Sequence, residues 1–483
     1  MKKALCSICA CLLFAAALTA CGAAAQPAET PPVSQAPPAT ETPVPTPRPM
    51  IRVGDGEYSP EIHGLILDAP DADTLQELCQ RADEFPSLQS IILRGVSLTT
   101  EQLLALREAF PKAALQYQLS LFGQEVPGDT RTLSLRNCTP EEIDGALLVQ
   151  AAQLLDELTL IDLSDDVRTE TVKDRYDRDV DVELEPYWSL EELAALRAAL
   201  PERVRLECRF RLFDQTLDSQ MTEIIYEKAG LKNEDLDTVR TAFPLLPDCT
   251  RFVMDNCGPQ YEALAELREE YPDKGVVWRV HFRGDSILTD AHSLWSVCID
   301  DANCYRLNYC TEMEYIDIGH DEAINTISFT AYMPHLKVLI CALTDIKDIS
   351  PLANCPELEY LEIFGTQVRD LSPLTNCTKL EHLNISTLYA HDITPIYGLT
   401  NLKRLWVVNS GGIPREQLDE FQRLVPDCEV CRYAENPTEG GWRRDKNGMV
   451  PRYALLREQI GYWYYNSPND KIDWEKSWQP GYA

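Results

Sequence analysis

Four stretches spaced 22 residues apart decide the fold of this chain: Leu336-Lys337-Val338-Leu339, Leu358-Glu359-Tyr360-Leu361, Leu380-Glu381-His382-Leu383 and Leu402-Lys403-Arg404-Leu405. Two residues after each second leucine stands another small or apolar residue: Cys341, Ile363, Ile385 and Val407. The first three units continue into an Asp-Ile/Leu-x-Pro-Leu/Ile segment, at 348–352, 370–374 and 392–396, and a weaker unit, Met313-x-x-Ile316-x-Ile318, lies upstream. A repeat of this length is one structural unit that recurs, so it fixes the architecture.

Each unit predicts one turn of a coil. A short strand carries the leucines into the interior and the intervening residues outward, and the proline segment brings the chain back along the convex side. One unit cannot bury its apolar edge, but stacked units share a continuous core. Cys355 and Cys377 occupy the same place in successive units, which indicates a packing role. The expected fold is α/β, a solenoid with short parallel strands.

These units resemble leucine-rich repeats, in particular the 22-residue type of internalin-like bacterial surface proteins. The resemblance covers about 120 residues. It departs from the family pattern in a longer connection within the third unit and in the ladder asparagine, which is replaced by Thr344, Thr366, Leu388 and Ser410. The resemblance implies a leucine-rich repeat solenoid that binds a partner on its concave face.

A looser recurrence fills the N-terminal half. Amphipathic helices are predicted before a proline, and alternating strands follow three of them. The helix copies are 103–111, 193–201, 264–272 and 418–426; the strands are 115–121, 206–212 and 276–282, which end in Phe122-Gly123-Gln124, Phe213-Asp214-Gln215 and Phe282-Arg283-Gly284. The pattern predicts degenerate helix–strand leucine-rich units over 51–290, with a separate α/β domain as the alternative.

The N-terminus reads as an export signal. Lys2 and Lys3 precede an apolar stretch, 4–18, that is too short to span a membrane. The stretch ends in Leu18-Thr19-Ala20-Cys21, which resembles the lipobox of bacterial lipoproteins. The resemblance implies a signal peptide at 1–20, a diacylglycerol on Cys21 and an extracytoplasmic protein anchored to the cell membrane. The alternative is an ordinary signal peptide with a chance cysteine.

Composition narrows the classes of partner. The net charge of −33 disfavours nucleic acid and anionic lipid head groups. Of the 17 cysteines, the 13 beyond Cys21 are odd in number and not tightly paired, so most are expected to be small buried hydrophobes. Cys428 and Cys431 form the one C-x-x-C motif. It is compatible with a local disulfide, with two buried thiols, or with zinc binding or redox activity.

Motifs of catalysis are not found, so no cofactor, metal or enzyme activity is expected. The acidic cluster 162–166 and the alternating acids of 177–185 admit calcium, but a solvated strand face explains them as well. Arg283-Gly284-Asp285 spells an adhesion tripeptide, although a turn requirement explains its glycine and aspartate.

Residues between the inward leucines should line the concave face in columns. Exposed aromatic and arginine side chains close together are typical of binding hot spots. The predicted partner-binding residues are Tyr360, Glu362, Phe364, His382, Asn384, Arg404 and Trp406. The alternative is that several of them pack under the C-terminal segment or a loop.

The sequence thus divides into a signal peptide (1–20), a lipid-anchored Pro/Thr/Ala-rich linker (21–50), a degenerate α/β repeat-like region (51–290), a leucine-rich repeat domain (291–435) and an aromatic C-terminal tail (436–483). The tail is expected to cap the solenoid end, with a ligand-stacking platform as the alternative. The predicted function is non-catalytic binding of a protein or peptide partner, or of a glycan, at the cell envelope. The alternative is a cell-envelope hydrolase or carbohydrate-active enzyme in 51–290, with the repeats as a targeting module.

Overall fold

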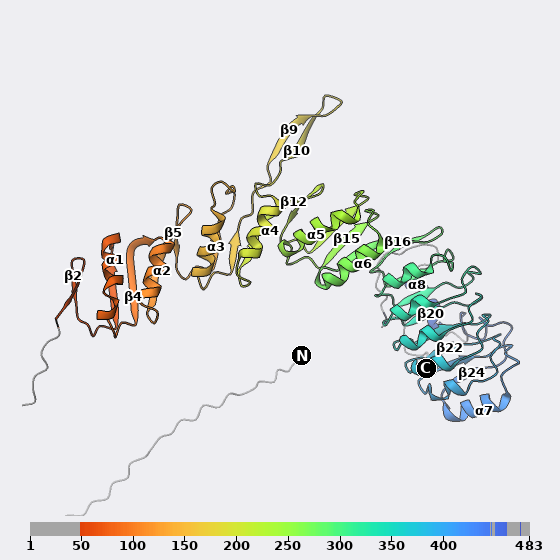
Figure 1. Ribbon diagram of the computed structural model, residues 1–483. Helices are drawn as coiled ribbons and strands as arrows, with labels where there is room; N and C mark the ends of the chain where they lie inside the picture. The colour runs from red at the N-terminus through yellow and green to blue at the C-terminus, as the bar shows by residue number, and fades with distance from the viewer. Residues whose placement is uncertain (1–48, 445, 447–449, 461–473, 475–483) are drawn as a thin grey trace, which may run out of the picture.

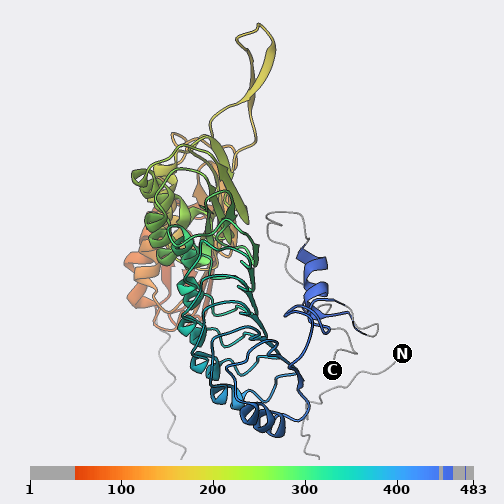
Figure 2. The same ribbon diagram turned by 90° about the vertical axis from the view of Figure 1, so that its right-hand side faces the viewer.

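A computed structural model describes residues 49–444, 446, 450–460 and 474. The described chain forms an elongated arc (Figure 1), with helices along one side and strands along the other (Figure 2). The signal peptide, Cys21 and nearly all of the linker lie outside the described residues. The concave face is defined here as the surface of the parallel strands that points away from the helices.

Three related modules make up the N-terminal part, after a small hairpin formed by β1 (Ile51–Val53) and β2 (Gly56–Tyr58). Each module alternates three parallel strands with two helices and closes with an antiparallel hairpin. The first contains β3 (Gly64–Asp68), α1 (Ala72–Gln80), β4 (Ser90–Leu98), α2 (Thr100–Ala109), β5 (Ala114–Leu121) and β6 (Gln124–Pro127). The second contains β7 (Thr132–Ser134), α3 (Gly145–Leu154), β8 (Leu160–Asp162), α4 (Leu190–Ala199), β11 (Arg205–Glu207), β12 (Arg209–Leu212) and β13 (Gln215–Asp218). The third contains β14 (Glu223–Glu227), α5 (Leu236–Ala242), β15 (Arg251–Asp255), α6 (Tyr261–Glu270), β16 (Val276–His281) and β17 (Ser286–Leu288).

The second helix of each module (α2, α4 and α6) ends shortly before a proline, as the sequence predicts. Thr99 with Gln102 and Ser189 with Glu192 form capping boxes at the starts of α2 and α4. Each helix buries leucines against alternating apolar positions of the strands, such as Leu65 and Leu67 of β3. The apolar faces of the helices and of the strands therefore pack against each other in one core.

Glutamines at the hairpin turns join the first two modules to their successors. The Gln124 amide donates to the Ser134 carbonyl of β7 at 3.1 Å, and the Gln215 amide donates to the Ile225 carbonyl of β14 at 2.8 Å. These glutamines end the Phe-Gly-Gln and Phe-Asp-Gln signatures. Each one binds the next module where the backbone ladder itself is interrupted.

One hairpin leaves the solenoid altogether. β9 (Thr169–Lys173) and β10 (Asp179–Glu183) pair only with each other and project from the second module (Figure 1). All of their residues are exposed.

The 22-residue units form one continuous parallel sheet of seven strands. The strands are β18 (Ser293–Trp295), β19 (Tyr315–Asp317), β20 (Val338–Ile340), β21 (Tyr360–Glu362), β22 (His382–Asn384), β23 (Arg404–Trp406) and β24 (Glu429–Cys431). Short 3₁₀ helices cover most of the convex side: η5 (Cys304–Tyr309), η6 (Ser328–Tyr332), η7 (Ser350–Asn354), η8 (Ser372–Asn376) and η9 (Thr394–Gly398). Before β24 an α-helix, α7 (Arg415–Leu424), takes their place. The leucine-rich repeat solenoid predicted from the sequence is confirmed.

A left-handed residue follows many strands in both regions. Ala69, Lys228 and Leu343 have positive φ, and their N–H groups donate to carbonyls of Arg94, Asp255 and Phe364 on the next unit. In the 22-residue units the same position is His320, Leu343, Gly365, Thr387 and Asn409. The large helical units and the short units thus follow one coil geometry.

Side chains that replace the ladder asparagine satisfy buried backbone groups. The Thr344 and Thr366 hydroxyls donate to the Cys341 and Ile363 carbonyls at 2.7 and 2.8 Å.

The Cys355 thiol donates to the Thr330 carbonyl of the preceding unit at 3.3 Å, and burial raises its pKa to about 12. The register-locked cysteines are therefore packing groups, as predicted.

Candidate functional site

The concave face of the seven-stranded sheet carries two columns of side chains. The strand register aligns Tyr315, Val338, Tyr360, His382 and Arg404 in one column. It aligns Asp317, Ile340, Glu362, Asn384 and Trp406 in the other. The predicted partner-binding residues on the strands therefore do project from this face.

The chain itself covers these columns. After β24 it turns back over the concave face toward the earlier strands, so that the segment lies across the sheet (Figure 2). We call the described residues of 432–460, with Trp474, the strap; it includes α8 (Arg452–Ile460). Its contacts lie on the concave face, whereas a cap over the solenoid end was expected.

The predicted binding residues are buried under the strap. The exposed fraction is 1% for Tyr360, 0% for Glu362, 3% for Phe364, 1% for His382, 0% for Asn384, 7% for Arg404 and 0% for Trp406. The expectation that they are exposed is wrong, and packing against the strap is the cause. Their role in binding a partner stays a prediction.

Trp442 lies at the centre of the strap contact. Its ring centroid is 5.3 Å from Tyr360, 5.1 Å from Trp406 and 6.0 Å from His382. The tryptophan is 1% exposed. These rings belong to a second apolar cluster, separate from the solenoid core, that includes Tyr453 and Leu456 of the strap. Aromatic burial of this kind dominates many interfaces.

Glu362 is the polar centre of the same contact. Its carboxylate accepts from the Trp442 indole at 2.7 Å, from Arg443 Nε at 3.0 Å, and from the Tyr360 hydroxyl. Burial alone would lower the pKa of Arg443, but the Glu362 charge outweighs it and raises that pKa. A fully buried carboxylate is tolerated because three donors from two directions satisfy it.

Further acid–base pairs fix the rest of the strap. Arg457 contacts Asp317 at 3.3 Å, Arg452 pairs with Glu359, and Lys446 contacts Glu429 at 3.3 Å. Burial raises the pKa of Asp317 to about 6, and the Arg457 charge opposes that shift.

The sheet side chains also bind the strap backbone. Arg404 donates to the Gly441 carbonyl at 2.7 Å, and the Trp406 indole donates to the Glu439 carbonyl at 3.0 Å. Asn384 donates to the Pro437 carbonyl at 3.0 Å. These contacts hold a segment of turns by its main-chain carbonyls, and Gly440 and Gly441 in that segment have positive φ.

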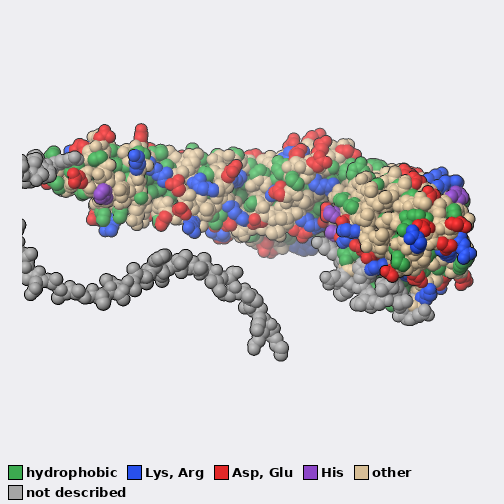
Figure 3. All heavy atoms as spheres, turned by 90° about the horizontal axis from the view of Figure 1, so that it is seen from below, with side chains coloured by type: hydrophobic (Ala, Val, Ile, Leu, Met, Phe, Trp, Pro, Cys, Tyr) green, Lys and Arg blue, Asp and Glu red, His purple; other side chains and the backbone are tan. Residues whose placement is uncertain are grey.

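The concave face of the three modules, called here the open face, carries its own ion pairs; it is exposed only in part, since Val253 and Val277 on it are buried. Arg279 donates to both oxygens of Asp255 at 2.7 and 2.8 Å, and Arg251 lies 2.7 Å from Asp290. Apolar Ile66 and Ile225 lie on this face with exposed fractions of 46% and 42%. Basic and acidic side chains are interspersed along the molecule (Figure 3).

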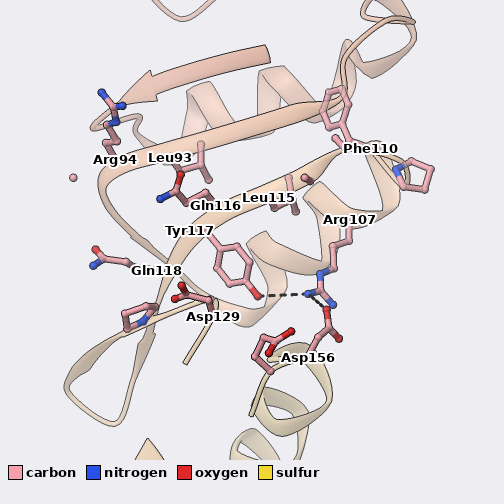
Figure 4. A pocket seen from close by; sticks show the side chains of 17 residues that line it. Leu93, Arg94, Arg107, Phe110, Leu115, Gln116, Tyr117, Gln118, Asp129 and Asp156 are labelled. Atoms are coloured by element: carbon pink, nitrogen blue, oxygen red, sulfur yellow. Dashed lines mark hydrogen bonds and ion pairs between the residues drawn. The ribbon is translucent and has the colours of Figure 1, made fainter. Parts of the chain in front are cut away.

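A cavity of about 910 Å³ lies where the first module meets the second (Figure 4). Arg107 reaches across it to Asp156 at 2.9 Å and to the Leu154 carbonyl at 2.8 Å, and contacts the Tyr117 hydroxyl at 3.4 Å. This arrangement links α2 to the end of α3. Sequence reasoning did not identify the cavity.

The remaining sequence motifs have structural roles. Asp165 contacts Arg209 at 3.6 Å, and Lys173 contacts Asp179 at 2.7 Å, so these acids face cations of their own chain. Within the described residues no group of three or more possible metal ligands occurs. The Arg283-Gly284-Asp285 tripeptide forms the β16–β17 turn, closed by the Phe282 N–H on the Asp285 carbonyl at 2.8 Å.

Most cysteines are buried, and all 13 in the described part of the chain are free thiols, Cys428 and Cys431 included. None of the described helices is both long and apolar enough to cross a membrane.

Comparison with known proteins agrees with the repeat assignment. A family model for leucine-rich repeats (two copies) matches residues 334–376. An internalin from Listeria monocytogenes is 16% identical, with 79% of this chain and 91% of that one covered and a TM-score of 0.27. A leucine-rich repeat protein from Leptospira interrogans is 14% identical, with 77% and 90% covered and a TM-score of 0.26. No curated protein sequence matches the chain.

Proposed function

We propose that this chain is a non-catalytic leucine-rich repeat protein, lipid-anchored through Cys21 outside the cytoplasmic membrane of a bacterium, that binds a protein partner on its concave face. The observation that carries the proposal is the strap. A polypeptide segment is already held on this face by aromatic burial, ion pairs and main-chain hydrogen bonds. A surface that binds one peptide has the chemistry to bind another.

The proposed binding surface has two parts. Tyr360, Glu362, Phe364, His382, Asn384, Arg404 and Trp406 contact the partner when the strap is absent, and the strands of the three modules continue the surface. The proline-rich stretch 23–49 serves as a stalk between the lipid and the solenoid.

Photo-cross-linking tests the partner surface by position. A photoreactive residue replaces Ile66 or Ile225 on the concave face, or Leu104 on the helical face; their exposed fractions are 46%, 42% and 43%. Since exposure is matched, only the face differs. The expected result is one common adduct from Ile66 and Ile225 and none from Leu104. Equal adducts from all three positions, or none from the concave pair, contradict the proposal.

Replacing Cys21 tests the anchor. In Cys21→Ser the thioether cannot form, so the protein should leave the membrane fraction and lose its lipid mass. Unchanged membrane association and mass would show that another feature retains the chain.

A further inference from the structure

The strap and the surface beneath it have opposite charge. The chain as a whole is strongly acidic, at −33. Yet the strap places Arg443, Lys446, Arg452 and Arg457 over carboxylates of three strand units, those of β19, β21 and β24. The surface beneath the strap is therefore an acidic cradle, defined by Asp317, Glu359, Glu362, Glu381 and Glu429.

The centre of the cradle is more selective than its rim. Glu362 has no exposed area, and the ring positions of Tyr360, His382 and Trp406 surround Trp442. A peptide that placed an apolar or acidic residue over Glu362 would leave a buried carboxylate without a cation, which is strongly unfavourable. The adjacent ring pocket requires a flat side chain with an N–H donor. A tryptophan followed by an arginine meets both requirements.

We propose that the strap is an internal stand-in for the partner, and that the partner is a protein carrying an exposed Trp-Arg pair flanked by further basic residues. Such a segment displaces the strap and seats on Glu362 and the ring pocket. The inference rests on the proposed function, because it names the chemistry of the partner for the same face.

Competition with the strap sets the binding strength. A tethered segment acts at an effective concentration on the order of millimolar. A free peptide with the same contacts at micromolar concentration is therefore largely excluded from the intact chain. A partner can displace the strap if it makes additional contacts on the open face of the three modules, or if the strap contacts have been weakened.

The test uses the full chain and a labelled synthetic peptide of residues 436–460. In Trp442→Ala/Arg443→Ala the strap loses its central contacts, so the peptide should bind at least tenfold more tightly than to the unaltered chain. Adding Glu362→Gln should remove that binding. Arg444→Ala is the matched control, since the side chain of this neighbouring arginine is 79% exposed and pairs with Glu439 of the strap itself; this variant should bind the peptide as weakly as the unaltered chain.

Three results would overturn the inference. One is a folded double variant that does not bind the peptide. Another is equal binding of a peptide in which Trp442 and Arg443 are both alanine. The third is tighter binding in Arg444→Ala equal to that in the double variant. If the double variant does not fold, Arg443→Gln alone replaces it and should still show a gain in peptide affinity over the unaltered chain.

The outcomes also separate this inference from the proposed function. Concave-face adducts at Ile66 and Ile225 without peptide binding would leave a partner on this face but reject the Trp-Arg chemistry. Peptide binding without any adduct would keep the strap site and reject a protein partner on the open face.

Discussion

The two parts of the solenoid satisfy their concave faces in opposite ways. In the three modules, arginines and carboxylates on the same face pair with each other, as Arg279 does with Asp255. In the 22-residue units, Glu362 and Asp317 pair with Arg443 and Arg457 of a segment far along the chain. On the first surface these charged side chains are paired without any covering segment. On the second, the buried carboxylates are paired only when a basic segment covers them.

The length of the repeating unit explains why the two parts of the solenoid carry different helices on their convex sides. Strands start at Glu223 and Arg251 in the third module but at Tyr360 and His382 in the repeats, which are 28 and 22 residues apart. The longer return holds an α-helix, while the shorter one holds a proline-started 3₁₀ helix. The hairpins that close each module also break the sheet, so only the repeats form one uninterrupted ladder.

The largest difference between the two faces should appear when one carboxylate is removed from each and the stability costs are compared. Glu362→Ala leaves Arg443 buried without its partner, and breaking a buried pair in this way costs about 3–5 kcal/mol. Asp255→Ala removes a largely buried partner that accepts two hydrogen bonds from Arg279, and should cost less, about 1.5–3 kcal/mol. Hydrogen exchange of α8 should rise sharply in the first variant and stay unchanged in the second. Equal exchange in both would mean that the strap does not depend on Glu362.

Core truncations should show whether the two parts fold independently. Leu361→Ala and Leu206→Ala each remove a buried leucine side chain, at 0% and 2% exposure, and such changes cost about 2–5 kcal/mol. Because solenoid units contact only their neighbours, each loss should speed exchange in its own region. Destabilisation of both regions by either variant would instead indicate one cooperative unit.

Acid should act on the covered face through two groups whose protonation has opposite effects on strap docking. The pKa of Asp317 is raised to about 6 by burial, so its protonation favours strap docking as pH falls from 7 to 5. The pKa of His382 is lowered well below its usual value by burial and by the charges of Arg452 and Arg404, so docking is disfavoured below the ordinary histidine range.

Single substitutions separate these contributions. Asp317→Asn removes the titrating carboxyl, so the gain in docking between pH 7 and pH 5, about tenfold or 1.4 kcal/mol in the unaltered chain, should disappear. His382→Asn should have the opposite effect. Exchange rates of α8 at pH 7 and 5 measure both; identical pH profiles for the two variants would contradict the assignment.

The smallest expected effect lies at the module junctions. Gln215→Ala removes a side-chain hydrogen bond to the Ile225 carbonyl, and a bond of this kind is worth about 0.5–1.5 kcal/mol. Gln153→Ala, on the exposed side of α3, provides the control and should be neutral or slightly stabilising. Denaturant unfolding measures the difference. A loss in Gln153→Ala as large as that in Gln215→Ala would remove the junction role.

Local patterns were sufficient for the architecture. The leucine spacing from Leu336 onward predicted the strands, the columns and the role of Cys355, because each depends on contacts between adjacent units. The helix copies and capping boxes were predicted for the same reason. The three-module organisation was missed, since only the second helix of each module retained a recognisable signature.

The covering of the site depended on distant contacts. Trp442 lies 80 residues from Glu362 along the chain, and no periodicity links them. A signal was present: seven basic residues and several aromatic residues gather in the tail of an acidic chain. Read as charge complementarity with Asp317, Glu359 and Glu362, that composition would have predicted a segment lying over the face.

The hairpins that close the modules have a consequence for the reach of the molecule. Because the backbone ladder ends at β6, β13 and β17 and a glutamine bridges each of the first two junctions, each module has its own strand ladder within the shared hydrophobic core. Adding or deleting one such module would change the distance between β1 and the acidic cradle by a fixed step, while the cradle and the strap remain the same.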